Sequence, residues 1–147
     1  MNRYAIAAAA LLAAAALGTQ AQMKPEDQVK QRRSGMAIIG HNFGSLAAMA
    51  QGKKPYNQEE AGRNADLVAA LADYPHAFFV EGTDKGETKA KPEIWQKKAD
   101  FDDKMKKMVS EAKKLPQAAR TDVATLKAAV GETGKACKAC HDDYRAK

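Results

Sequence analysis

The chain of 147 residues contains few cysteines, few aromatic residues and no segment that alternates convincingly between apolar and polar side chains. Because such alternation is the mark of a half-buried strand, its absence favours an all-α fold. The 24 Lys and Arg residues are scattered among 18 Asp and Glu residues, which predicts a solvated surface of mixed charge. No basic stripe is interleaved with aromatic side chains, and this argues against a nucleic-acid partner.

Long hydrophobic runs are also scarce, and the run over residues 5–17 is too short to span a bilayer comfortably. Arg3 precedes this run, and Thr19-Gln20-Ala21 ends it with small residues at the two positions that a signal peptidase reads. We therefore interpret residues 1–21 as a cleaved signal peptide, which predicts export to the periplasm. The alternative is a retained membrane anchor, which the cleavage pattern disfavours. Residues 22–147 are expected to form one domain.

Helical periodicity marks four segments, which are separated by stretches rich in Gly, Pro and Asn. The expected helices cover about 25–52, 57–75, 92–116 and 117–147. The fourth has the clearest inward stripe, with alternating steps of four and three residues. That stripe consists of Ala119, Val123, Leu126, Val130, Thr133, Cys137, Cys140 and Tyr144. One such seam among four helices predicts an antiparallel four-helix bundle with a cofactor in its core. The loop from about 76 to 92 is long enough to be functional.

The two cysteines predict covalent attachment of a haem. Cys137 and Cys140 are three residues apart, and His141 follows directly. On a helix this C-x-x-C-H spacing places both thiols on one face, where they can bond to the two vinyl groups of one porphyrin edge. The histidine is displaced by one residue, so its imidazole can reach the iron as the proximal ligand. One haem c is the expected cofactor.

Three other interpretations of the cysteine pair are weaker. A thioredoxin-like dithiol requires a βαβ context and a helix N-terminus that lowers the thiol pKa, and neither is expected here. A zinc site would need further ligands, and only His41 and His76 remain. A disulfide between positions i and i+3 of one helix would strain the bridge geometry.

The second axial position of the iron is less determined. The six residues after His141 contain neither Met nor His, so a protein ligand would have to come from upstream. Met36 lies on the inner stripe of the first helix, either as a thioether ligand or as packing, and the sequence leaves both open. His41 falls off this stripe and His76 starts the long loop, so both are expected to be surface or packing residues.

Arginines near the expected haem are candidates for contacts with its propionates. Arg32 lies on the inner stripe, where burial of a guanidinium is costly unless a carboxylate meets it, as a propionate would. Arg33 is the next candidate, and the alternative for each is a side chain that reaches solvent. Arg145 follows His141 by one helical turn, either near the imidazole or porphyrin edge or simply as a cation at a helix C-terminus.

Several motifs in order resemble the cytochrome c′ family, the class II c-type cytochromes, over essentially the whole mature length. They are Lys24-Pro25-Glu26-Asp27, His41-Asn42-Phe43-Gly44, Gly52-Lys53-Lys54-Pro55-Tyr56, Gly82-Thr83-Asp84-Lys85-Gly86, Pro92-Glu93-Ile94-Trp95 and Cys137 through Arg145. The resemblance implies an up-down-up-down four-helix bundle with one five-coordinate, high-spin haem c. It also implies a protein that binds NO and CO and transfers electrons to an unidentified periplasmic partner.

The resemblance assigns roles around the open face of the iron. Met36 and Phe79 would border the distal pocket, and because neither can shuttle protons, no enzymatic activity is expected. Arg145 would be the basic residue near the proximal histidine. His76 stands where some relatives have Trp. A low-spin class II cytochrome with Met36 on the iron, acting only as an electron carrier, is the alternative that the family pattern allows.

The resemblance makes two further assignments. Arg32, Arg33 and Thr88 would contact the haem propionates. The family commonly forms homodimers through the first two helices, where Ala48 and Met49 would contribute contacts.

Overall fold

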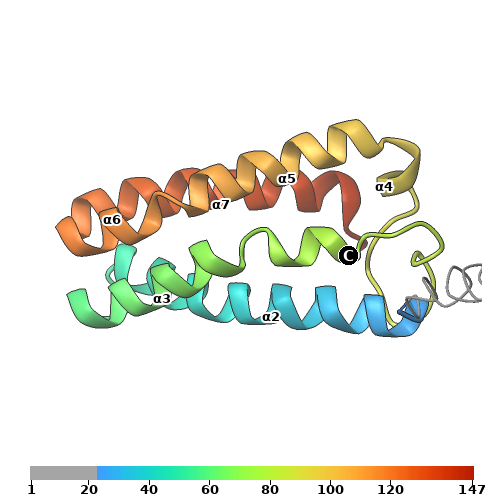
Figure 1. The fold of residues 1–147 in the computed structure, drawn as a ribbon. Coiled ribbons are helices and arrows are strands. Elements are labelled where there is room, and N and C mark those ends of the chain that lie inside the picture. The colour runs from blue at the N-terminus through green and yellow to red at the C-terminus, as the bar shows by residue number, and fades with distance from the viewer. Residues whose placement is uncertain (1–22) are drawn as a thin grey trace, which may run out of the picture.

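The computed structural model describes residues 23–147, so the predicted signal peptide at 1–21 lies outside the described residues. Figure 1 shows long helices lying side by side in a bundle, with an irregular loop at one end. Within residues 23–147 the only strand-like pairing is an isolated antiparallel bridge between Ala90 and Arg145. No helix in this part of the chain is long and apolar enough to cross a membrane.

The architecture is the predicted antiparallel up-down-up-down four-helix bundle. In chain order the helices are α2 (Pro25–Ala50), α3 (Gln58–Leu71), the 3₁₀ helix η1 (Tyr74–Phe78), α4 (Glu93–Gln96), α5 (Lys98–Ala112), α6 (Leu115–Thr121) and α7 (Val123–Tyr144). The third predicted helix is divided into α4 and α5, and the fourth into α6 and α7. The 3₁₀ helix η1 occupies the start of the predicted loop. The long helices pack as α2 against α3 and α7, and α5 against α7.

Two backbone breaks divide the predicted helices. Lys97 leaves the helical region between α4 and α5, with φ −122° and ψ 45°. Asp122 is fully extended between α6 and α7, and its Oδ1 accepts a hydrogen bond from the Thr125 N–H at 2.7 Å. This N-cap starts a new helix at Val123 instead of continuing the previous one. The predicted inward position of Val123 is therefore wrong, and its side chain is 43% exposed.

The core changes in character along the bundle. Where α3 meets α6, Ala61, Ala65 and Ala119 have no exposed surface, which lets the two backbones approach closely. Larger side chains such as Leu46, Leu126 and Phe101 are fully or almost fully buried in other parts of the interior. Met49 belongs to this core at 1% exposure, so its predicted role in a dimer contact is wrong, since its side chain is already covered within one chain.

Gly35 allows η1 to pack closely on α2. A Cβ at this position would lie 2.9 Å from Cδ1 of Tyr74 and 3.1 Å from Cγ of Pro75, which is buried. Real Cβ atoms are almost never found so close to a neighbour. The absence of a side chain at Gly35 therefore determines where the chain enters the loop after η1.

Replacing Gly35 with Ala should destabilise the protein by about 1–3 kcal/mol, because the methyl group overpacks this contact. Gly44→Ala, on the same helix, is the matched control: a Cβ there meets nothing within 4 Å. The control should instead stabilise by about 0.5–1 kcal/mol through helix propensity. Urea unfolding of both variants measures the two changes, and equal changes would contradict the packing argument.

Candidate functional site

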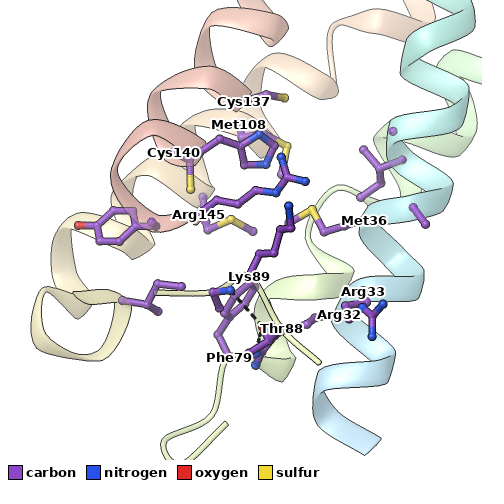
Figure 2. Close-up of a pocket in the computed structure, with 18 of the residues that line it drawn as sticks. Arg32, Arg33, Met36, Phe79, Thr88, Lys89, Met108, Cys137, Cys140 and Arg145 are labelled. Carbon is purple, nitrogen blue, oxygen red and sulfur yellow. Dashed lines mark hydrogen bonds between the residues drawn. The ribbon is translucent and has the colours of Figure 1, made fainter. Parts of the chain in front are cut away.

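All the residues assigned to a site from the sequence line one cavity of about 890 Å³ in the bundle. They are Arg32, Arg33, Met36, Phe79, Thr88, Cys137, Cys140, His141 and Arg145. The volume is within the range of about 300–1,000 Å³ for small-molecule and cofactor sites. Figure 2 shows α2 on one side of the cavity and α7 on the other, with Met36 across from the two cysteines.

The α7 wall presents the two thiols. Burial raises the pKa of the Cys140 thiol to about 11, with a further contribution from Cys137, and burial also raises the pKa of Cys137. Both groups are therefore S–H, not thiolate, at neutral pH. A redox dithiol needs a lowered thiol pKa, so the local environment disfavours that alternative. The two sulfurs are free, not joined in a disulfide.

His141 is accessible through the cavity, yet enough protein surrounds its imidazole for desolvation to matter. Desolvation lowers the pKa of His141, and the positive charge of Arg145 lowers it further. The ring is therefore neutral at pH 7, with a lone pair available on one nitrogen. That is the form in which histidine binds a metal. The other two described histidines do not line the cavity: His41 is exposed on α2, and His76 Nε2 lies 2.7 Å from Asp102 Oδ1.

The opposite wall is apolar. Met36 projects from α2 into the cavity, and Phe79 follows η1 with its ring centroid 4.8 Å from that of Phe101. Further lining comes from Val68, Ile39, Ile94, Met105 and Met108. None of these side chains can donate or accept a proton, so this side of the cavity excludes water without offering general acid or base chemistry.

Arg32 is buried at 2% exposure, and oxygens of the protein compensate its charge. No carboxylate of residues 23–147 is hydrogen-bonded to it. One terminal nitrogen donates to the Phe78 carbonyl at 3.1 Å and to Thr83 Oγ1 at 2.6 Å, while the other donates to the Thr83 carbonyl at 2.5 Å and to Thr88 Oγ1 at 2.9 Å. The guanidinium also lies over the Phe79 ring, 4.8 Å from its centroid. Neutral oxygens and a π face thus replace the water that burial removes.

These bonds make Arg32 the anchor of the long loop. Burial lowers the pKa of Arg32 and the Asp84 charge opposes this, so the guanidinium keeps its charge at neutral pH. The hydrogen bonds connect α2 to the end of η1 and to two points of the loop. Thr88, predicted as a propionate contact, here accepts from Arg32 and also from the Ala90 N–H at 3.0 Å.

Arg33 also has a protein partner. Its Nη1 lies 2.7 Å from Glu87 Oε2 in an exposed ion pair. The far end of the loop is joined to the chain after α7: the Lys91 N–H donates to the Tyr144 carbonyl at 3.0 Å, and the Ala146 N–H donates to the Lys89 carbonyl at 2.8 Å. The loop therefore connects the two walls of the cavity.

Lys89 is a lining residue that the sequence analysis missed. It lies among several charged residues in an irregular segment, where no periodicity indicates direction. The backbone bonds to the C-terminal segment place it at the cavity, and Figure 2 shows its side chain extending into the space between Met36 and Arg145.

The lining fits a flat, apolar group with an anionic edge. Most of the wall is hydrocarbon or thioether, while the charged lining residues comprise four cations (Arg32, Arg33, Lys89 and Arg145) and one anion, Glu87. A porphyrin with two carboxylates has this combination of properties. Two thiols and a neutral imidazole on one wall supply the groups that attachment and ligation of a c-type haem require.

The fold and cavity together define a helical-bundle protein built around an apolar, anionic cofactor. Residues 27–145 match the family described as Cytochrome C′. The cytochrome c′ of Rubrivivax gelatinosus is 45% identical over 126 residues, covering 84% of this chain and 98% of that protein. Its crystal structure superposes with a TM-score of 0.81. The chain belongs to the cytochrome c′ family, whose members are haem proteins.

Two other solved structures are similarly close. Cytochrome c prime from Shewanella frigidimarina has 43% identity and a TM-score of 0.81, over 84% of this chain and 98% of that chain. A nitric oxide complex of a mutant cytochrome c prime from Alcaligenes xylosoxidans has 38% identity and a TM-score of 0.77, over 84% and 97%.

Replacing Arg32 with Met should destabilise the protein by about 3 kcal/mol, because several buried acceptors lose their donor together. Arg33→Met is the matched control, since Arg33 is 55% exposed and loses only a surface ion pair, worth less than about 1 kcal/mol. Urea unfolding gives the stabilities, and amide hydrogen exchange over residues 79–92 reports the loop. Unchanged exchange in the Arg32→Met variant would show that Arg32 does not hold the loop.

Proposed function

We propose that this protein is a periplasmic cytochrome that holds one haem c through Cys137 and Cys140, with His141 on the iron, and binds NO and CO on the opposite face. The observation that carries the proposal is one largely apolar cavity with both thiols and the neutral imidazole on one wall. When bound, the haem supplies an iron centre that exchanges single electrons and binds diatomic gases.

The two walls of the cavity have different roles. Cys137 and Cys140 fix the cofactor to α7, and the imidazole of His141 is held one residue further along the same helix. Met36 and Phe79 cover the other face and exclude water from it. Because Met36 and Phe79 cannot transfer protons, reversible binding and electron exchange are favoured over enzymatic turnover.

Gas binding is further supported by the solved nitric oxide complex of the Alcaligenes xylosoxidans relative. A high-spin, five-coordinate iron is the simplest state for such a function, because it leaves one axial position open to the ligand. NO handling and electron transfer are both consistent with this state.

A homodimer and a periplasmic redox partner are also part of the proposal. Ile38 on α2 and Leu67 on α3 are each 46% exposed, so the first two helices carry large apolar side chains on their outer surface. Such side chains suit a contact with a second copy of the chain. The partly buried Ala48 lies on the same two-helix unit, whereas Met49 does not contribute.

A second candidate function is that of a pure electron carrier with Met36 as the sixth ligand. The observation that favours it is the position of Met36, which projects into the cavity from the wall opposite Cys137 and Cys140. A thioether on the iron would close the gas site and raise the reduction potential.

Spectroscopy of the haem-loaded protein and a Met36→Ala variant distinguishes the two functions. We expect a high-spin ferric spectrum and CO uptake by the ferrous protein. Met36→Ala should leave the spin state unchanged and tighten CO binding about tenfold, equivalent to about 1.4 kcal/mol of relieved steric contact. Met108→Ala widens the same cavity from α5 and should change CO binding much less.

Other results of the same experiment would contradict the proposed gas binding. The parent protein could be low-spin and fail to bind CO, while Met36→Ala, but not Met108→Ala, becomes high-spin. These results would identify Met36 as an iron ligand and the protein as an electron carrier. Purified protein without covalent haem, judged by intact mass, would contradict both functions.

A further inference from the structure

We infer that Lys89 binds a haem propionate, and that Arg32 acts indirectly by holding the loop that carries Lys89. This inference rests on the proposed function, since it requires a haem in the cavity. It departs from the assignment by resemblance, in which Arg32 and Arg33 hold the propionates.

The four cations that line the cavity differ in their interaction partners. Both terminal nitrogens of Arg32 are committed to neutral oxygens of the protein, and Arg33 is paired with Glu87. Arg145 affects the pKa of His141 through its charge, which places it on the proximal side. Lys89 differs from these, because its ammonium makes no hydrogen bond or ion pair among residues 23–147.

Hydrogen bonds fix the backbone around Lys89. The Lys89 carbonyl accepts from the Ala146 N–H at 2.8 Å, and the neighbouring Ala90 pairs with Arg145 in the isolated bridge. Lys91 reinforces this junction, since its Nζ donates to the Asp143 carbonyl at 2.9 Å. A long side chain on a fixed backbone can direct its charge into the cavity with little further ordering of the chain.

Electrostatics supports the same assignment. Across the charged lining, only Glu87 is anionic, and Arg33 already neutralises it. Lys89 is exposed at the mouth of the cavity, and a carboxylate that enters beside it would form a charge-assisted hydrogen bond with its ammonium. The α5 side of the cavity contributes Phe101, Met105 and Met108, so it offers Lys89 no competing charge.

The test compares Lys89→Gln with Lys85→Gln in the haem-loaded protein. Lys85 is an exposed lysine of the same loop that does not line the cavity, so it controls for net charge. The measurement is the midpoint potential of the haem as a function of pH. Ionisation of a propionate adds negative charge near the iron, so the potential falls as pH rises through the propionate pKa.

An ammonium beside the propionate keeps that pKa low. Lys89→Gln should therefore move the fall in potential to higher pH by about one pH unit, within the 1–3 units typical of losing an adjacent opposite charge. Lys89→Arg should retain the parent profile. Redox-difference infrared spectra should show a change in a propionate carboxylate band in Lys89→Gln alone.

The outcomes separate this inference from the proposed function. If covalent haem is present but Lys89→Gln and Lys85→Gln have the same potential profile, the inference is overturned while the proposed function stands. If Arg32→Lys reproduces the shift expected of Lys89→Gln with the loop still protected from hydrogen exchange, the propionate contact belongs to Arg32 instead. If the parent protein carries no covalent haem, both proposals fail.

Discussion

A cavity of about 890 Å³ at one end of the bundle is the constraint to which the rest of the fold responds. Most of its lining is apolar, and apolar surface left in contact with water forgoes about 25 cal/mol per Å² of burial. The net stability of a domain is only about 5–15 kcal/mol. A cofactor that fills the cavity therefore contributes to stability as well as to function, and the close packing of Ala61, Ala65 and Ala119 elsewhere holds the helices together independently of it.

The second constraint is the buried charge of Arg32. A guanidinium at 2% exposure is unfavourable unless its N–H groups are satisfied, and the chain satisfies them with backbone and threonine oxygens of η1 and the loop. The same bonds fix the loop on α2, while its other end pairs with the chain after α7. The cost of burying one cation is thus offset by contacts that also build a wall of the site.

The sequence predicted most of this arrangement because helical periodicity and the C-x-x-C-H motif are both local signals. The spacing of Cys137, Cys140 and His141 determines the α7 wall wherever that helix lies. Val123 was misplaced because periodicity continues through a break that depends on a single extended residue and its cap. Lys89 was missed for a different reason, since its position depends on pairing with residues more than 50 positions away, and no local pattern encodes such a contact.

The end of α7 illustrates how several weak constraints hold a functional motif that one alone could not. Helix termini tend to fray, and His141 lies only one turn from the last helical residue.

Three contacts oppose fraying at the end of α7. The Tyr144 hydroxyl donates to Asp100 of α5, and burial together with this carboxylate raises the pKa of Tyr144 to about 12, so the donor remains protonated. The Tyr144 ring packs edge-on against Phe101, with centroids 5.4 Å apart. The bridge at Arg145 then fixes the chain just beyond the helix. Because two of these contacts come from α5 and the third comes from the loop, the end of α7 is held only while both α5 and the loop are in place, which couples the position of His141 to the packing of the bundle.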